Sequence, residues 1–222
     1  MDQSATRRVG RPPGSSREML QEAAAELFLE QTYAKTTIDQ IARRAGVSRN
    51  TFFNYFHAKS DLLWVEVDSA LARLPQALAD ADADADADAQ RSVTGAVRAA
   101  VLDMAGGLDP SRVPWALTQS ELMGTAGDLA ESALSRFRSA ASLLSVFVAR
   151  RTGLPADDLL CWSFTMAALA AAAAAARTWA GSGVSRGTLI PYVDTALSPV
   201  CAGFAPVLDR PPASGNIEIA RR

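Results

Sequence analysis

The residues whose types and spacing could do chemistry lie together in SRNTFFNYFH, the segment from Ser48 to His57. Arg49, Asn50 and Asn54 supply hydrogen-bond donors and acceptors, and Phe53 adds a ring in a chain with an aromatic content of only 7%. Such groups match the base edges of a DNA major groove, where a ring can contact a thymine methyl group. The segment therefore favours a surface that reads nucleic acid.

A short helix is needed to present these groups. Ser48 is a good N-cap residue, and the spacing predicts a helix that continues to about Phe56. Phe52 and Phe56 then share one face, which we expect to be buried against Val47, Leu27, Ile38 and Ile41. Arg49, Asn50, Phe53, Asn54 and His57 lie on the other faces, with Tyr55 at the margin.

Two further helices are predicted before this one. A capping box from Ser15 to Glu18 opens a helix that ends near QTYAK, and a second box, Thr37 to Gln40, opens a shorter helix. Gly46 suits the left-handed residue that ends such a helix. A long helix followed by two short ones joined by AGVS has the layout of a helix-turn-helix.

The rest of the chain is predicted to be helical, because no strand-like alternation of apolar side chains persists. One helix is expected from 61 to about 78, with a kink or stop at Pro75. Further helices are expected at 91–105, 112–122, 127–151, 156–180 and 186–206. The fold class is therefore all-α, with about nine helices.

Charge is uneven although the net charge is only −2. Residues 1–60 carry +3, which favours a polyanionic partner, and the remainder carries −5. We expect a disordered basic arm at 1–14, a DNA-binding domain at 15–60, a helical domain at 61–208 and a mobile tail at 209–222. In the arm, Arg11 is placed to enter a narrow minor groove, although a solubilising tail explains it equally well.

The run DADADADADA at 80–89 has five Asp residues at every second position. It lacks the Gly and the closing Glu of a calcium loop, so we interpret it as a solvated linker or an acidic helix surface and expect no metal. The two cysteines, Cys161 and Cys201, are expected to be reduced and buried. No signal peptide is recognisable, and the Ala-rich segment 159–180 is expected to be a close-packed helix rather than a membrane span, which favours a cytoplasmic location.

The segment TTIDQIARRAGVSRNTFFNYFHAKSDLL resembles the DNA-binding domain of TetR-family transcriptional regulators, over about residues 15–65. The shared features are the Thr-capped helix, the AGVS turn, the aromatic spacing and the Lys that follows. The resemblance implies phosphate contacts by Thr37, Tyr55 and Lys59 and groove contacts by Arg49, Asn50 and Phe53. Asn50 stands where the family often has Gly and Phe53 where it often has Tyr, so the operator sequence cannot be carried over. The full set of predicted DNA-contacting residues is Arg11, Thr36, Thr37, Ser48, Arg49, Asn50, Phe53, Asn54, Tyr55 and Lys59.

The same resemblance implies a C-terminal domain that binds a small effector and dimerises through its last two helices, here 156–180 and 186–206. Two copies would then read a palindromic operator in double-stranded DNA. Bulky apolar residues of the middle helices are candidates for the wall of an apolar effector pocket, although ordinary core is the more common role for each such residue. They are Met104, Trp115, Leu122, Met123, Phe137, Leu144, Trp162, Phe164 and Met166.

Two segments, KSDLLWVEVDSALARLPQAL and FVARRTGLPADDLLCWSF, also look like a subgroup of the family that contains the mycofactocin-system regulator. That subgroup is associated with acyl-CoA effectors. Arg136, Arg138, Arg150 and Arg151 could meet an anionic head group, or they could form a solvated helix face.

Two other classes of function compete with a repressor. An enzyme is disfavoured because the single His, His57, has no nucleophile motif, phosphate loop, cofactor motif or metal-ligand spacing around it. A helical protein-interaction module without specific DNA reading is disfavoured by Arg49, Lys59 and the basic arm. Retained partner binding without specific DNA binding would favour the module.

Overall fold

The computed structural model describes residues 16–87, 92–114, 117, 126–183 and 186–209. These residues are helical, with turns between the helices, as predicted. They form two compact units, with the boundary between Leu62 and Leu63. Ser15 of the first predicted capping box, Arg11, most of the predicted helix 112–122 and the tail from residue 210 lie outside the described residues.

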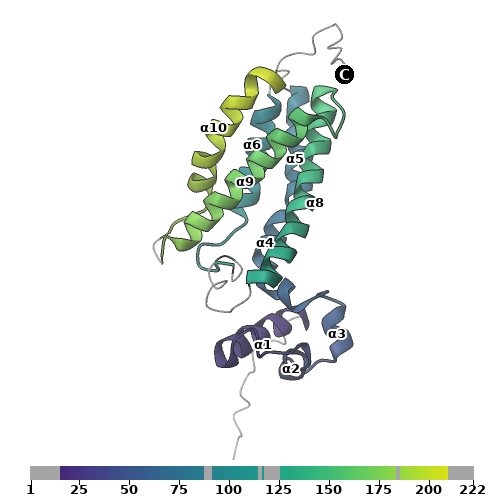
Figure 1. The fold of residues 1–222 in the computed structure, drawn as a ribbon, viewed down its shortest axis with the longest axis vertical. Helices are drawn as coiled ribbons and strands as arrows, with labels where there is room; N and C mark the ends of the chain where they lie inside the picture. The colour runs from purple at the N-terminus through teal and green to yellow at the C-terminus, as the bar shows by residue number, and fades with distance from the viewer. Residues whose placement is uncertain (1–15, 88–91, 115–116, 118–125, 184–185, 210–222) are drawn as a thin grey trace, which may run out of the picture. The chain divides into compact units, whose positions relative to one another are not determined.

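The first unit contains α1 (Ser16–Gln31), α2 (Ile38–Arg44) and α3 (Arg49–Phe53), drawn in purple to blue in Figure 1. Its core is formed where the apolar faces of these helices meet, and it includes the fully buried Leu20, Ile41 and Phe52. Arg44 of α2 also forms ion pairs with Glu26 and Glu30 of α1 (3.0 and 2.8 Å). The α1–α2 packing therefore has a buried apolar side and an exposed charged side.

The second unit is a bundle formed by α4 (Val65–Leu71), α5 (Leu74–Ala87), α6 (Val93–Gly106), α8 (Ala126–Thr152), α9 (Leu159–Gly181) and α10 (Ile190–Leu208) (Figure 1). In this bundle α6 packs against α5 and α10, and α9 packs against α8 and α10. One continuous core of buried apolar residues joins these helices and includes Val97, Leu144, Phe164 and Trp179.

The predicted helix from 61 to 78 is wrong as a single element. The structure divides it into the 3₁₀ turn η1 (Lys59–Leu63), α4 and α5, with α4 ending at Leu71. A proline ring clashes with the carbonyl group four residues earlier in a helix, which for Pro75 is the carbonyl of Leu71. Pro75 lies instead in the first turn of α5, where a missing N–H costs nothing. The predicted stop is therefore confirmed, and it falls upstream of the proline.

The acidic run is helical as far as Ala87, within α5. Ala81 is buried, and Asp82 forms ion pairs with Arg150 and Arg151 of α8. This part of the run is therefore an acidic helix surface that contacts the bundle. For residues up to Ala87 the helix interpretation is correct and the linker interpretation is not. Arg150 and Arg151, which the sequence offered as contacts for an anionic head group, pair here with Asp82 of their own chain.

Among the described residues, α9 is long and apolar enough to cross a membrane by length and composition. In the structure it packs against α8 and α10 as the predicted close-packed helix, with Cys161, Phe164 and Trp179 among its buried residues. It begins at Leu159 because Asp158 caps it, with Asp158 Oδ1 accepting a hydrogen bond from the Leu160 N–H (2.8 Å).

Both cysteines are free and buried, as predicted. Burial raises the pKa of the Cys161 and Cys201 thiols above the usual value. We expect Ellman's reagent to label neither thiol in the native protein and both in guanidinium chloride, because thiolate is the reactive form and both sulfur atoms are shielded from the reagent. Rapid labelling of one thiol in the native state would contradict this burial.

Candidate nucleic-acid interface

The turn between α2 and α3 is built from local hydrogen bonds that the sequence predicted. Thr37 Oγ1 accepts from the Gln40 N–H (3.2 Å), and Gln40 Oε1 accepts from the Thr37 N–H (2.8 Å), which completes the capping box. Gly46 has φ +71°, and the N–H groups of Gly46 and Val47 donate to the carbonyls of Arg43 and Ala42. This Schellman pattern ends α2 where a residue with a side chain would be strained.

The next helix also begins at its predicted cap. Ser48 Oγ accepts a hydrogen bond from the Thr51 N–H (3.0 Å), which satisfies one of the free donors at the start of α3. The helix ends at Phe53, earlier than the predicted Phe56, and Asn54 forms its C-cap. Phe56 nevertheless remains buried, because its N–H still donates to the Phe52 carbonyl as in a helix and so keeps Phe56 on the same face as Phe52.

The segment from Arg49 to Phe56 has the predicted two-sided character. The rings of Phe52 and Phe56 are 0% and 3% exposed and pack at 5.5 Å between centroids. Phe53 and Tyr55 are 41% and 45% exposed, and Asn50 and Asn54 are exposed beside them. Buried rings on one side thus hold amide and aromatic groups open to solvent on the other.

Arg49 is held in place by two neighbours. Its guanidinium group forms an ion pair with Asp39 of α2 (2.9 Å) and lies 5.6 Å from the centroid of the Phe53 ring. Both members of the pair are more than half exposed, so the pair contributes little to stability and can be exchanged for another acceptor. Asp39 thus orients a side chain that has donors available for a base edge or a phosphate.

The prediction that Thr36 contacts DNA is wrong. Its side chain is 1% exposed, and its hydroxyl donates to the carbonyl of Thr32 (2.8 Å) while accepting from the Gln31 amide (3.2 Å). A buried hydroxyl group with these partners positions the turn before α2. Thr37 and Ser48 are exposed, but their hydroxyl groups serve as helix caps, so direct DNA contacts by them stay predictions.

Lys59 makes contacts within the chain that the sequence did not predict. Its ammonium group donates to the main-chain carbonyls of Tyr33 and Thr36 (2.8 Å each) and lies 3.9 Å from the centroid of the Tyr33 ring. The Tyr33 ring is itself buried. This lysine therefore binds the chain between α1 and α2 to the start of η1, and a phosphate contact by its ammonium group stays a prediction.

Sequence reasoning missed Asp39 and Tyr33 as functional neighbours. Asp39 looked like an ordinary acidic residue in the first turn of α2, and Tyr33 like the end of α1. Their partners, Arg49 and Lys59, are ten and 26 residues away along the chain. No local pattern encodes such distances, because they depend on how the helices cross.

The described residues among those predicted for the effector pocket are divided between the core and the surface of the second unit. Leu144 and Phe164 are fully buried core, and Met104 and Phe137 are half-buried against that core. Trp162 and Met166 are corrected as pocket walls, because they lie on the outer face of α9 and are 39% and 42% exposed. Trp115, Leu122 and Met123 lie outside the described residues.

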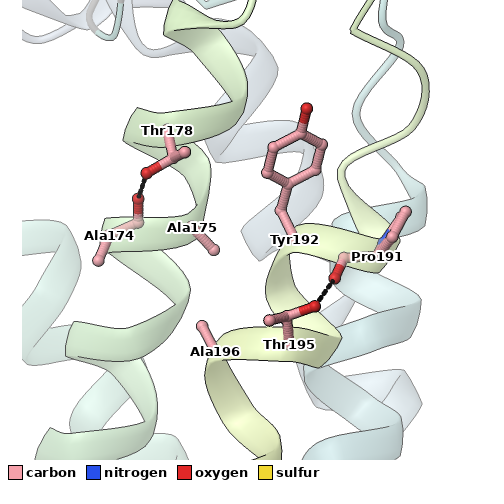
Figure 2. Close-up of a pocket in the computed structure, with 7 residues that line it drawn as sticks. All are labelled: Ala174, Ala175, Thr178, Pro191, Tyr192, Thr195 and Ala196. Carbon is pink, nitrogen blue, oxygen red and sulfur yellow. Dashed lines mark hydrogen bonds between the residues drawn. The ribbon is translucent and has the colours of Figure 1, made fainter.

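A groove of about 430 Å³ lies between α9 and α10 (Figure 2). We call it the α9–α10 groove. It contains none of the predicted pocket residues and is lined mainly by small side chains, namely Ala174, Ala175, Thr178, Pro191, Tyr192, Thr195 and Ala196.

A polar cluster joins α4 to α8 within the second unit. Arg136 donates to both carboxylate oxygens of Asp68 (2.6 and 2.8 Å), and its guanidinium lies 5.2 Å from the centroid of the Trp64 ring. The indole N–H of Trp64 donates to Ser132 Oγ (2.8 Å). The Arg136 side chain is only 17% exposed, so its charge is committed to this contact. Arg136 is therefore not the open anion contact that the sequence also allowed.

Comparison with known proteins places this geometry in a family. Residues 20–64 match the profile described as bacterial regulatory proteins of the tetR family, and residues 91–205 match the profile described as the MftR C-terminal domain. The mycofactocin biosynthesis transcriptional regulator MftR of Mycobacterium tuberculosis is 27% identical over 172 residues. The match covers 78% of this chain and 83% of that protein.

Solved structures show the same fold. FadR of Thermus thermophilus, a TetR-family repressor in complex with lauroyl-CoA, superposes with a TM-score of 0.53 at 22% identity, covering 90% of this chain and 99% of that one. FadR of Bacillus subtilis, in complex with stearoyl-CoA, gives 0.52 at 16% identity, covering 84% and 98%. Because one profile covers the helix-turn-helix and the other covers more than half of the chain, the chain belongs to the TetR family of transcriptional regulators, in the MftR-like subgroup.

Proposed function

We propose that this regulator is a homodimeric repressor that binds a palindromic operator through the exposed side of α3 and the residues after it. The observation that carries the proposal is the exposed group of Arg49, Asn50 and Phe53 above a buried aromatic base. A rigid short helix with amide, guanidinium and ring groups on its outer side suits direct readout in a major groove. Access to chromosomal DNA implies a cytoplasmic location.

Dimerisation would let the protein contact two half-sites of the operator at once. Two recognition helices that are about 34–36 Å apart can read half-sites one helical turn apart, which makes the operator a palindrome. The helices proposed to form the dimer are α9 and α10, whose outer faces carry exposed apolar side chains such as Trp162, Met166 and Val207.

The proposed effector is a small apolar molecule of the acyl or acyl-CoA class. Two proteins of the same fold were solved with lauroyl-CoA and stearoyl-CoA, which supports this class. The core of the second unit is apolar, and Met104 and Phe137 pack half-buried at its edge, which suits contact with a fatty chain. An effector changes DNA affinity only if it binds the two conformations of the regulator unequally.

The Asp68–Arg136 ion pair is the proposed mechanical link between effector and DNA. It ties α4, the first helix after the boundary at Leu62 and Leu63, to α8 of the bundle. An effector that moves α8 would move α4 through this contact, and with it the chain that leads into the DNA-binding unit. The separation of the two reading surfaces would then change.

The proposed function is tested with labelled DNA from the upstream region of the chain's own gene. Fluorescence anisotropy would be measured with and without saturating lauroyl-CoA, and coenzyme A and laurate would be tested separately. We expect tight sequence-specific binding that lauroyl-CoA weakens. Operator affinity that no acyl compound alters would reject the effector class, and binding no tighter than to random DNA would count against this operator.

Asp68→Asn is expected to reduce the effector's influence on operator affinity by about 2- to 30-fold, since mutations along a coupling route change the coupling by roughly 0.5–2 kcal/mol. Operator affinity without effector should change less. Asp103→Asn is the matched control, because Asp103 forms a bidentate ion pair with Arg73 (2.8 Å) that does not involve α8. An equal effector response in wild type and Asp68→Asn would exclude this link.

A further inference from the structure

The first residue of α3, Arg49, is held between two neighbours before any DNA is bound. In a helix-turn-helix the N-terminal residues of the second helix contact the base edges, and Arg49 has this position. Asp39, in the first turn of α2, binds one side of its guanidinium group. The guanidinium carbon also lies over the Phe53 ring, 5.6 Å from its centroid. The group is therefore oriented in advance.

This contact uses only part of the donor set of Arg49. Its Nη1 donates to both carboxylate oxygens of Asp39 (2.9 Å each). Its Nε and Nη2 donate to no other described residue, and the side chain is 57% exposed. A guanidinium group carries five N–H donors in a flat fork, so an adjacent pair of donors remains open. Such a pair matches the O6 and N7 acceptors of guanine.

The charge of Asp39 influences which acceptor the open donors can bind. Its carboxylate is 54% exposed, so a phosphate group that approached Arg49 would also approach this negative charge. Two negative charges at such a distance repel each other, whereas guanine O6 and N7 belong to an uncharged base. The carboxylate therefore opposes a phosphate partner more than it opposes a base. Opposition to the wrong partner is a recognised source of specificity.

We propose that Arg49 contacts a guanine in each half of the operator, and that Asp39 positions Arg49 for this contact and keeps it from phosphate. The ion pair need not break, because Nε and Nη2 supply the two N–H groups while Nη1 remains on the carboxylate. The inference rests on the proposed operator binding through α3. It names the base that is recognised and adds a specificity residue on α2.

The guanine contact is tested by selecting bound sequences from a randomised DNA library with the full-length wild type and with Arg49→Lys. Lysine keeps the positive charge but lacks the flat fork. We expect the variant to lose a guanine preference of about 5- to 150-fold in each half-site, the range for one good bidentate base contact. Its affinity for random DNA should stay the same, because that affinity depends on charge. Retention of every base preference by Arg49→Lys would overturn the contact.

The atoms of the contact are tested with an operator that carries 7-deazaguanine at the selected position. This base pairs normally but lacks the N7 acceptor. The wild type should bind the modified operator more weakly than the normal one, and Arg49→Lys should bind both equally. An equal loss in the two proteins would show that another residue contacts N7, which would also overturn the contact by Arg49.

The role of Asp39 is tested with Asp39→Asn, which removes the charge and keeps the size. The ratio of operator affinity to random-DNA affinity should fall at least about 5-fold. The slope of log K against log salt on random DNA should steepen by about 0.9, because Arg49 is then free to bind one phosphate. A residue that only stabilised α2 would not steepen this slope. Asp39→Glu keeps the charge and should recover part of the ratio.

Glu30→Gln is the matched control for loss of one carboxylate from the DNA-binding unit. Glu30 is as exposed as Asp39 (55% and 54%) and also forms an ion pair with an arginine, Arg44. It lies on α1, away from Arg49 in the chain, and its substitution should leave both the affinity ratio and the salt slope unchanged. Circular dichroism would verify that each variant remains folded.

Failure of the inference and failure of the proposed function give different results. A wild type that selects no sequence from the library would overturn the proposed function. Selection of an operator whose base preferences do not depend on Arg49 would overturn the guanine contact and leave that function standing. An equal salt slope on random DNA in wild type and Asp39→Asn would overturn the role of Asp39.

Discussion

Lys59→Ala is expected to lower the free energy of unfolding of the DNA-binding unit by roughly 3 kcal/mol, because it removes two charge-assisted hydrogen bonds to buried main-chain carbonyls. The main-chain carbonyl groups of Tyr33 and Thr36 then lose the hydrogen bonds that the Lys59 ammonium group donates to them. The substitution also removes the cation from the face of the Tyr33 ring. Operator affinity should fall because the DNA-binding unit is less stable. Thermal unfolding followed by circular dichroism measures this loss of stability.

The salt dependence of DNA binding distinguishes this role from a phosphate contact. Loss of one phosphate contact flattens the slope of log K for DNA binding against log salt by about 0.9. Loss of a contact that only stabilises the fold leaves this slope unchanged for the protein that remains folded. The chain's other lysine, Lys35, is exposed and makes a suitable control for removal of one positive charge. A flattened slope with unchanged thermal stability in Lys59→Ala would show that the ammonium binds phosphate after all.

Asn50→Ala is expected to weaken operator binding by about 5- to 150-fold, the range for loss of one good base contact of roughly 1–3 kcal/mol. Asn50 is exposed on α3, and its side-chain amide forms no hydrogen bond within the described residues. The amide is therefore available for a base edge, and its removal should not destabilise the fold. Binding to random DNA should hardly change, because that binding depends on phosphate contacts.

The measurement compares operator and random DNA at one salt concentration for each variant. Gln76→Ala removes an exposed amide from α5, in the other unit, and should change neither affinity. If Asn50→Ala weakens both DNAs to the same extent, Asn50 contacts the backbone and carries no sequence information. If neither affinity changes, the reading surface does not include this residue.

Local rules predicted the elements that depend on neighbouring residues. The caps at Thr37 and Ser48 and the left-handed Gly46 each involve hydrogen bonds within a few residues, so their residue types are sufficient evidence. The inward direction of Phe52 and Phe56 follows in the same way from helical spacing. Errors concerned where elements end, as when the stop predicted at Pro75 fell upstream of it, at Leu71, because the proline ring cannot follow a helical carbonyl four residues earlier.

The sequence by itself determined the all-helical class, the helix-turn-helix and the side of α3 that faces solvent, because helix caps and side-chain periodicity are short-range properties. Only the tertiary structure decided that Lys59 and Thr36 support the turn, that Arg136 is bound to Asp68, and that Trp162 lies on an outer face. Each of these depends on residues that are distant in sequence, or on which face of a helix its neighbours cover. Hydrogen bonds and burial at such positions are determined by how the helices pack.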